Sequence, residues 1–436
     1  MYLQTFDKCT RPFTNMLTPT SSIVYYSLGG ASNLIRSTKT TLKFCNVGKQ
    51  VSVDSFLDEY RRILTIFVGA LWNLDKIPRL LPKDLTDPID SWLSARMIQC
   101  AGKQASGIVR GTRTKQEQRL FRIKELKKEG KFKQTRKLQR IYDHAKVTKP
   151  KIDRVEAELD SRFVEVDLNS KTKFVDGWLI LGSVGNKQKI IIPFRKSEHF
   201  NKMLSKGIMK KGVRVGPELL TFMFDLPNVP EKTTGETVGI DIGKITTISC
   251  SNGFQSRPNK HGHDLNSILE IMARKQKGSK GFKKCQAHRL NYIHWSINQL
   301  NLQNVRQINL ERMMNVNQGR RVSRTLARWT YRDIFGKLET CCEEQGVLVQ
   351  KVSPTYTSQR CSKCGWTRKN NRKGTLFKCG QCGNTMDADL NASLNIALEL
   401  PEIGRKDRLK GINRKGFYWF PKGQESIVPA VKKALK

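Results

Sequence analysis

The chain has 436 residues, and its composition is strongly basic: 79 Lys and Arg against 38 Asp and Glu give a formal charge of +41. This charge is far outside the usual range of enzymes that act on small molecules, because self-repulsion of this size destabilises a compact fold unless a polyanion binds. Nucleic acid is therefore the first candidate partner. Hydrophobic residues make up 38%, which excludes wholesale disorder, and the length suggests about two to four domains.

The N-terminal quarter is predicted to hold strands followed by helices. Residues 1–50 are rich in Thr and Ser, and the apolar residues 23–26 favour a strand. Ile63–Leu74 is the longest apolar run, and it is too short for a membrane span, which needs about 18 residues. A second helix is predicted over Ile89–Val109, and no signal peptide is visible at the N-terminus. Ahead of this second helix, apolar residues recur at helical intervals from Val53: Phe56, Tyr60, Ile63, Phe67 and Leu71.

Residues 103–151 form the most basic segment, with 17 Lys or Arg against four acids. Its weak helical periodicity is consistent with a solvated helix face, but the charge of the whole chain favours a helical arm that binds phosphate. The candidate contact residues are Arg119, Arg122, Lys127, Lys128 and Arg136.

A β-rich module, such as a small barrel, is predicted over residues 162–235. Strands are expected at Arg162–Leu168, Trp178–Val184 and Lys189–Phe194. Turns are expected at Gly177 and at Gly185-Asn186.

The 11 cysteines do not indicate a disulfide framework, because the count is odd and no secretory signal accompanies it. Two pairs stand out: Cys361-Ser-Lys-Cys364 and, after 14 intervening residues, Cys379-Gly-Gln-Cys382. Four thiolates at this spacing are typical of a closed tetrahedral Zn²⁺ site, which is structural because it leaves no open coordination position. A redox pair or a chance spacing is the alternative.

Carboxylates stand at three points where a strand ends or a helix starts. Asp241 lies in a strand–turn–strand pattern over Thr237–Ser249, and Glu311 ends a strand from Arg306. Asp387 and Asp389 open a helix that runs to Leu398. Taken singly, each could be an edge-strand, exposed or helix-capping acid. Together they indicate a carboxylate cluster that needs cations, and two Mg²⁺ would suit phosphodiester cleavage.

These motifs, taken in order, resemble one known family over residues 235–400. The family comprises the TnpB-like transposon-encoded RNA-guided nucleases and the miniature type V CRISPR effectors that share their architecture. The matching segments are Gly239-Ile-Asp241-Ile-Gly243, Arg274-Lys-Gln-Lys-Gly-Ser-Lys280, the strand ending in Glu311, Trp329-Thr-Tyr-Arg-Asp-Ile334, Tyr356-Thr-Ser-Gln-Arg-Cys361 with both cysteine pairs, and Ala388-Asp389-Leu-Asn-Ala-Ser-Leu-Asn-Ile396.

The resemblance implies a multidomain α+β protein. An RNase H-like (RuvC) α/β nuclease domain with an inserted zinc ribbon would follow a helical recognition lobe and a β-barrel wedge domain. The expected ranges are wedge 1–50 and 158–235, recognition lobe with basic arm 51–157, nuclease 236–355 and 387–400, ribbon 356–386, and a basic C-terminal tail 401–436.

The resemblance also implies site residues. The acidic triad that binds two Mg²⁺ falls on Asp241, Glu311 and Asp389, and Asp389 is preferred to Asp387 because it adjoins Leu-Asn-Ala. One structural Zn²⁺ falls on the four cysteines. Lys275, Lys277 and Lys280 join the candidate nucleic-acid contacts.

The implied activity is RNA-guided cleavage of DNA. A guide RNA would pair with one strand of double-stranded target DNA, opened as an R-loop beside a short flanking motif that the protein reads. The protein would be a monomer or homodimer in the cytoplasm of a prokaryote, without a membrane partner. Two alternatives stay open: an RNA-guided repressor that does not cut, and a guide-independent resolvase or transposition accessory nuclease.

Overall fold

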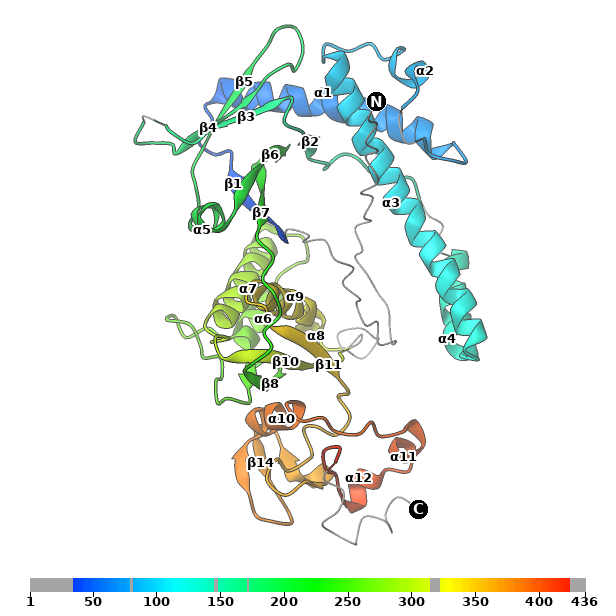
Figure 1. Cartoon of the computed structure of the whole chain (residues 1–436), viewed down its shortest axis with the longest axis vertical. Coiled ribbons are helices and arrows are strands. Elements are labelled where there is room, and N and C mark those ends of the chain that lie inside the picture. The colour runs from blue at the N-terminus through cyan, green and yellow to red at the C-terminus, as the bar shows by residue number, and fades with distance from the viewer. Residues whose placement is uncertain (1–33, 79–80, 145–147, 171, 314–321, 424–436) are drawn as a thin grey trace, which may run out of the picture. The chain divides into compact units, whose positions relative to one another are not determined.

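The structure is a computed structural model, and it describes residues 34–78, 81–144, 148–170, 172–313 and 322–423. The strand expected at residues 23–26 lies outside these ranges. The chain divides into two compact units, and the boundary falls between Asn228 and Val229. The relative placement of the two units is not determined, so each is described by itself (Figure 1).

The two longest helices of the first unit begin at capping residues. The side chain of Asn46 accepts a hydrogen bond from the Lys49 N–H at the start of the first long helix. The second predicted helix begins at Ala95 instead of Ile89, because Ser94 caps it by accepting from the Met97 N–H, and it continues well past Val109. The helices are α1 (Val47–Trp72), α2 (Lys83–Thr86), α3 (Ala95–Lys128), α4 (Phe132–His144) and α5 (Glu198–Lys206).

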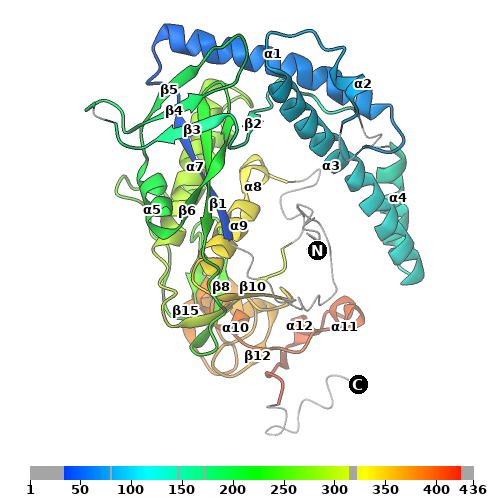
Figure 2. The same ribbon diagram turned by 45° about the horizontal axis from the view of Figure 1, so that its top comes forward.

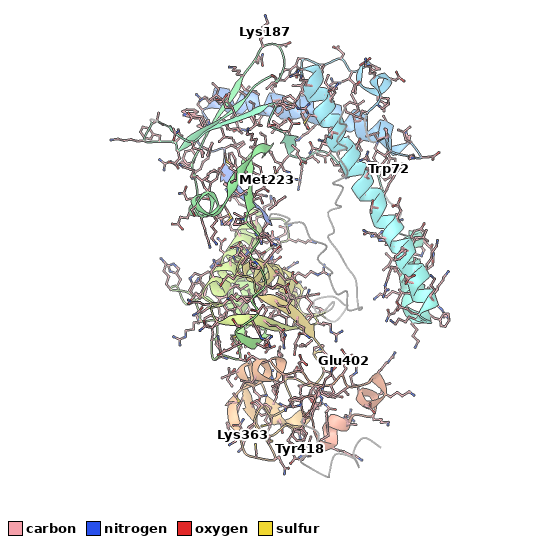
Figure 3. The ribbon with its side chains drawn as sticks, viewed as in Figure 1. Trp72, Lys187, Met223, Lys363, Glu402 and Tyr418 are labelled. Atoms are coloured by element: carbon pink, nitrogen blue, oxygen red, sulfur yellow. The ribbon has the colours of Figure 1, made fainter. Side chains whose placement is uncertain are left out.

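Helices α1 and α3 pack against each other, and α4 lies alongside the C-terminal part of α3 in both views (Figures 1 and 2). The guanidinium of Arg113 on α3 lies 5.7 Å from the ring centroid of Trp72, at the end of α1 (Figure 3). Gly130, with a φ of +66°, makes the turn into α4. The basic segment therefore forms a helical arm.

The strands of the first unit form two antiparallel sheets. One has the order β1-β7-β6-β2 and the other β3-β4-β5. The two sheets share one core with α1, α3 and α5. In this core, the ring centroid of Phe222 lies 4.9 Å from that of Phe194 and 5.2 Å from that of Phe200. The strands are β1 (Leu34–Thr41), β2 (Ala157–Leu159), β3 (Val164–Asp167), β4 (Gly177–Leu181), β5 (Ile190–Phe194), β6 (Ile208–Val215) and β7 (Leu219–Leu226).

Two details of the predicted β module were wrong. Hydrogen bonds between the described strands do not close the sheets into one barrel ring. Strand β4 starts at Gly177, which was expected in a turn, and ends at Leu181 instead of Val184. It ends there because Ser183, Asn186 and Lys187 adopt left-handed φ angles of 53°, 46° and 58°, which a strand cannot contain.

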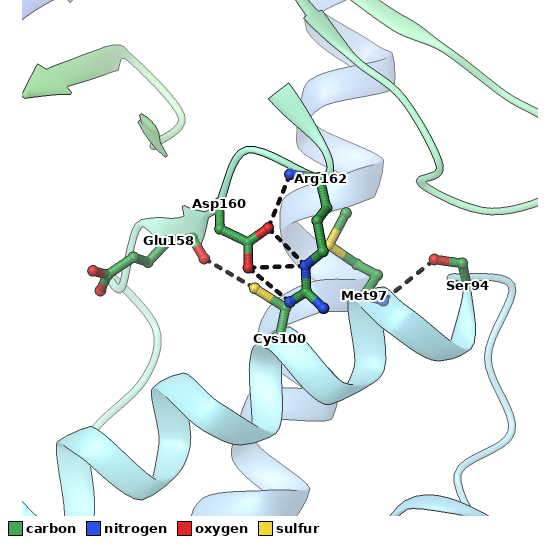
Figure 4. A network of polar contacts seen from close by, with 6 residues as sticks. All are labelled: Ser94, Met97, Cys100, Glu158, Asp160 and Arg162. Atoms are coloured by element: carbon green, nitrogen blue, oxygen red, sulfur yellow. Dashed lines mark hydrogen bonds and ion pairs between the residues drawn. The ribbon is translucent and has the colours of Figure 1, made fainter. Parts of the chain in front are cut away.

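A polar network joins α3 to the segment that follows β2 (Figure 4). The thiol of Cys100 donates to the carbonyl oxygen of Glu158 over 3.2 Å. Asp160 accepts three hydrogen bonds from the guanidinium of Arg162, and the shortest is 2.7 Å. These contacts hold the turn between β2 and β3 in place.

The second unit is built on a mixed sheet with the order β11-β10-β8-β9. Strand β10 (Val305–Glu311) runs parallel to both β8 (Glu236–Asp241) and β11 (Leu348–Val352), whereas β9 (Ser249–Cys250) is antiparallel to β8. The second strand of the pattern predicted over Thr237–Ser249 is present, but it starts only at Ser249. The helices around the sheet are α6 (Leu265–Ala273), α7 (Lys280–Asn298), α8 (Arg324–Arg328), α9 (Tyr331–Glu343) and α10 (Ala388–Ile396).

A small ribbon of short strands lies between β11 and α10 in sequence. Part of the segment expected as a tail belongs to this ribbon, because Phe417–Tyr418 pairs with Trp366–Thr367 (Figure 3). The guanidinium of Arg360 donates to the carbonyl of Trp419 over 2.7 Å, which fastens the same segment. Its elements are β12 (Trp366–Thr367), η1 (Lys369–Asn371), β13 (Arg372–Lys373), β14 (Leu376–Lys378), β15 (Thr385–Asp387), α11 (Arg405–Leu409), α12 (Ile412–Lys415) and β16 (Phe417–Tyr418).

Among the helices that the structure describes, none combines the length and apolar character needed to cross a bilayer. The described cysteines are all free thiols, so none of them forms a disulfide.

Candidate active site and metal centre

The three predicted acids lie at two strand ends and one helix start that the fold brings together. Asp241 is the last residue of β8 and Glu311 the last of β10, and these parallel neighbours end at the same edge of the sheet. Asp389 is in the first turn of α10, which packs on β8 and β10. The structure therefore brings Asp241, Glu311 and Asp389 into one pocket, in which the charges of Glu311 and Asp389 act on Asp241.

The packing of α10 on β8 depends on a glycine. A Cβ at Gly239 would lie 2.1 Å from the carbonyl oxygen of Ser393 and 2.3 Å from the backbone nitrogen of Ala397, so only glycine allows this approach. From β10, the amide of Asn309 donates to the carbonyls of Ile396 and Ala397 over 3.0 and 3.2 Å, at the end of the same helix. Both contacts fix the position of α10 relative to the strands that carry the other two acids.

The pocket is unfavourable for negative charge. Loss of solvation, followed by repulsion from Glu311 and then Asp389, raises the pKa of Asp241 to about 7. Burial raises the pKa of Glu311 as well, although a hydrogen bond from Thr357 and the charge of Arg372 oppose this. Three clustered carboxylates, with the pKa values of Asp241 and Glu311 raised, are the donor set expected for hard divalent cations such as Mg²⁺.

Two neighbours hold the other carboxylates in place. The hydroxyl of Thr357 donates to Glu311 Oε1 over 2.5 Å, and the guanidinium of Arg372, on β13 of the ribbon, donates to Asp389 Oδ1 over 2.7 Å. Tyr356, just before Thr357, has a φ of +60°, which is strained for a residue with a side chain. Arg372 supplies the nearest positive charge to the pocket.

Asp387 has a different position from Asp389. Its Oδ1 accepts from the N–H groups of Asp389 and Leu390 over 3.0 and 2.9 Å, and from the side chain of Gln255 over 2.8 Å. Asp387 is therefore the N-cap of α10. This geometry supports the preference for Asp389 as the functional acid.

A stability measurement tests the electrostatics of this pocket and does not need an activity assay. In metal-free protein at pH 8, Asp241→Asn should increase the free energy of unfolding by about 2–4 kcal/mol, because ionised Asp241 is unfavourable in a site that raises its pKa to about 7. Since the folded-state pKa of about 7 lies above the unfolded value of about 3.9, the native state retains the proton longer, so this part of the wild-type destabilisation should shrink as the pH falls below 7 and be lost only near pH 4.

Denaturant titration in EDTA at several pH values measures the effect. Glu402→Gln, at an exposed acid, is a matched control that should show no such gain. An Asp241→Asn protein no more stable than wild type at pH 8 would contradict the electrostatics described above.

The four ribbon cysteines form a second centre. Their sulfurs all lie within 4.8 Å of one another, and in the part of the chain that the structure describes they are the one set of three or more His, Cys, Asp or Glu ligands to converge so closely. The sulfurs of Cys361 and Cys382 are 3.7 Å apart, and those of Cys364 and Cys379 are 3.6 Å apart. Zinc–sulfur bonds of about 2.3 Å at tetrahedral angles require about 3.8 Å between sulfurs, so the residues fit Zn²⁺.

The candidate nucleic-acid contacts differ in accessibility. Lys127, Lys128 and Arg136 are exposed on the helical arm, and Lys275, Lys277 and Lys280 are exposed between α6 and the start of α7. Two arm residues are half-buried and held by neighbours: Arg122 pairs with Glu129 over 3.2 Å, and Arg119 donates to Gln116 over 3.1 Å. The exposed cations are therefore better candidates for phosphate contacts than Arg119 and Arg122.

Sequence reasoning missed Arg372, Thr357 and Gln255 as neighbours of the acids. Their contacts span 17, 46 and 132 residues of sequence. No local pattern marks a cation or a hydroxyl that meets a carboxylate only in the folded chain.

Comparison with known proteins agrees with this geometry. Residues 331–396, which contain the four cysteines and Asp389, match the family model of the Cas12f1-like TNB domain. The CRISPR-associated endodeoxyribonuclease Cas12f1 of Sulfoacidibacillus thermotolerans is 49% identical over 77 residues, which cover 17% of this chain and 18% of that protein. The chain is a relative of Cas12f1 and of the TnpB-like proteins. This confirms the resemblance predicted from the sequence.

Longer but weaker matches extend the comparison. A TnpB-like protein of Methanocaldococcus jannaschii is 25% identical over 264 residues, which cover 56% of this chain and 89% of that protein. The chain spans less than half the length of the first Cas12f1 relatives it matches, which reach coverages of 18%, 12% and 43%. A solved complex of Cas12f1 with guide RNA and target DNA has a TM-score of 0.44 at 16% identity, covering 84% of this chain and 99% of that one.

Proposed function

We propose that the protein is an RNA-guided DNA endonuclease that cuts target DNA beside a short flanking motif. The observation that carries this proposal is the pocket of Asp241, Glu311 and Asp389, fixed by α10 at the edge of a partly parallel sheet and joined to the four-cysteine ribbon. The family model of the Cas12f1-like TNB domain matches the segment that holds the ribbon and Asp389, and a relative named as a CRISPR-associated endodeoxyribonuclease is 49% identical over 77 residues.

We assign the parts of the chain accordingly. The sheet of β8 to β11 with α10 is the RuvC-type, RNase H-like nuclease domain, and the ribbon is inserted before α10. The helices α1 to α4 are the recognition lobe, and the two antiparallel sheets of the first unit are the wedge domain. The charge of +41 suits a protein that holds both a structured RNA and DNA in the cytoplasm of a prokaryote.

Cleavage would depend on carboxylates that bind cations. Two bound Mg²⁺ would supply a hydroxide nucleophile at neutral pH and neutralise the departing oxygen of the phosphodiester. In this chain, Asp241, Glu311 and Asp389 would hold the cations, and the hydroxyl of Thr357 orients Glu311. The ion pair between Arg372 and Asp389 offsets negative charge in the pocket.

Sequencing of copurified RNA tests the guided part of the proposal. We expect RNA of defined length with a constant part and a variable part, bound to the protein through repeated washes at moderate salt. RNA of random length and sequence would instead support a guide-independent resolvase or transposition accessory nuclease. Guided binding of DNA without cleavage would support the repressor alternative.

The helical arm should contribute affinity for RNA or DNA without affecting which nucleotide sequence is bound. Neutralising Lys127, Lys128 and Arg136 together should reduce the salt slope of RNA or DNA binding by about two to three units, since each lost phosphate contact removes somewhat less than one. Arg162→Gln is the control, because its guanidinium already pairs with Asp160. Filter binding at several salt concentrations measures the slopes, and an unchanged slope in the triple variant would show that the arm is only a solvated surface.

A further inference from the structure

The first residues of the ribbon lie between the two candidate metal centres. The hydroxyl of Thr357 donates to Glu311 Oε1 in the acid pocket over 2.5 Å. A few residues later, Cys361 is one of the four converging cysteines. Residues 357–362, which we call the joining segment, therefore connect a carboxylate of the pocket to a sulfur of the ribbon.

Two asparagines of α10 hold the joining segment. The amide of Asn395 donates to the carbonyl oxygens of Thr357 and Arg360 over 2.9 and 2.7 Å, and its oxygen accepts from the guanidinium of Arg360 over 2.6 Å. The amide of Asn391 donates to the same Arg360 carbonyl over 2.7 Å, and its oxygen accepts from the Ser362 N–H over 3.0 Å. The helix that presents the third acid is therefore fastened to the segment that carries a cysteine of the ribbon centre.

These contacts are buried. Arg360, Asn391 and Asn395 are at most 3% exposed, and the guanidinium of Arg360 also donates to the carbonyl oxygens of Trp419 and Cys361. Because the groups of this network share donors and acceptors, the joining segment cannot shift relative to α10 without leaving several buried polar groups unpaired. The position of the cysteine centre and the positions of the two acids therefore depend on each other.

We propose that Arg360, Asn391 and Asn395 couple the cysteine centre to the acid pocket, so that a divalent cation in the pocket tightens zinc binding and zinc tightens cation binding. Zinc orders the ribbon, and an ordered joining segment keeps both α10 and the hydroxyl on Glu311 in place. The coupling free energy is the same in both directions, since linkage between two binding sites is reciprocal. The inference rests on the proposed function in one respect, namely that the three acids bind divalent cations.

The zinc affinity of the full-length protein tests this coupling. It is measured by equilibrium competition with a zinc-selective chelator, with and without Mg²⁺ at constant ionic strength. Mg²⁺ suits the test because it binds carboxylate oxygens and not thiolates. We expect Mg²⁺ to increase the zinc affinity at least about fivefold, the lower end of typical coupling between sites. Asp241→Ala protein should show no increase, because its pocket has lost a cation ligand.

Variants of the network show which residues carry the coupling. Asn395→Ala should abolish the increase caused by Mg²⁺, whereas a merely structural role would weaken zinc binding equally with and without Mg²⁺. Thr357→Val keeps the side-chain size and removes the hydroxyl on Glu311, so it should reduce the increase even if Asn395→Ala fails to fold. Asn413→Ala is the matched control, because Asn413 donates to Gln359 in the same ribbon outside the network and should keep the full increase.

Electron paramagnetic resonance of added Mn²⁺ separates failure of the coupling from failure of the proposed function. Wild-type protein that binds Mn²⁺ through Asp241, but whose zinc affinity does not respond to Mg²⁺, would overturn the coupling and leave the nuclease site standing. Wild-type protein without Mn²⁺ binding that depends on Asp241 would contradict the nuclease site and the coupling together. A full increase in both Asn395→Ala and Thr357→Val proteins would overturn the assignment of these residues.

Discussion

Asp241→Ala, Glu311→Ala and Asp389→Ala should each reduce cleavage of guide-matched DNA by roughly a thousandfold or more, since each acid belongs to one cation-binding unit. The losses should not add in double variants, because any single removal disables the same pocket. Cleavage of a plasmid target in Mg²⁺ measures the effect. Binding of RNA and of guide-matched DNA should persist in all three variants, because in the proposed mechanism the acids bind cations and not the guide or the target bases.

Asp387 offers the internal control for these variants. Asp387→Asn keeps an oxygen that can accept from the first turn of α10, so Asp389 should stay in place and cleavage should persist. Asp387→Ala removes the cap, which costs about 0.5–2 kcal/mol, and should retain activity at moderate temperature. Loss of cleavage in Asp387→Asn with retention in Asp389→Ala would show that the roles of the two acids are reversed.

Replacement of any one ribbon cysteine should release zinc and unfold the ribbon. Structural zinc sites couple binding to folding, and their ions contribute about 10–16 kcal/mol in isolated peptides at neutral pH. Cys361→Ala or Cys379→Ala should therefore give about one Zn²⁺ fewer per chain than the wild type and faster proteolysis within residues 356–386. The ribbon carries Arg360 and Arg372, so cleavage should fall as well.

Cys342→Ala is the matched control for the zinc prediction. Cys342 is buried in the core of the second unit and does not belong to the four converging ribbon cysteines. Its replacement should leave the zinc content unchanged. Wild-type zinc content in Cys361→Ala protein would contradict the ribbon site.

The convergence of the four ribbon cysteines was predictable because they come in local pairs whose spacing is typical of a zinc site. The acids were predictable only as a set, because Asp241, Glu311 and Asp389, taken singly, could each be an edge-strand, exposed or helix-capping acid. The helical arm followed from charge and periodicity.

What could not be predicted depends on contacts between distant segments. Arg372 meets Asp389 only because the ribbon folds against α10, and Phe417–Tyr418 joins the ribbon through pairing with Trp366–Thr367. The start of α3 at Ala95 depends on Ser94, one of several polar residues that could have capped it.

The most direct test of the proposed function is programmed cleavage. Protein reconstituted with a guide RNA of chosen sequence is given two plasmids that differ only in whether they match the guide, in Mg²⁺ and then in EDTA. We expect cutting of the matched plasmid alone, only in Mg²⁺, and not by Asp241→Ala protein. Equal cutting of both plasmids, cutting in EDTA, or robust cutting by the Asp241→Ala protein would contradict an RNA-guided nuclease that works through these carboxylates.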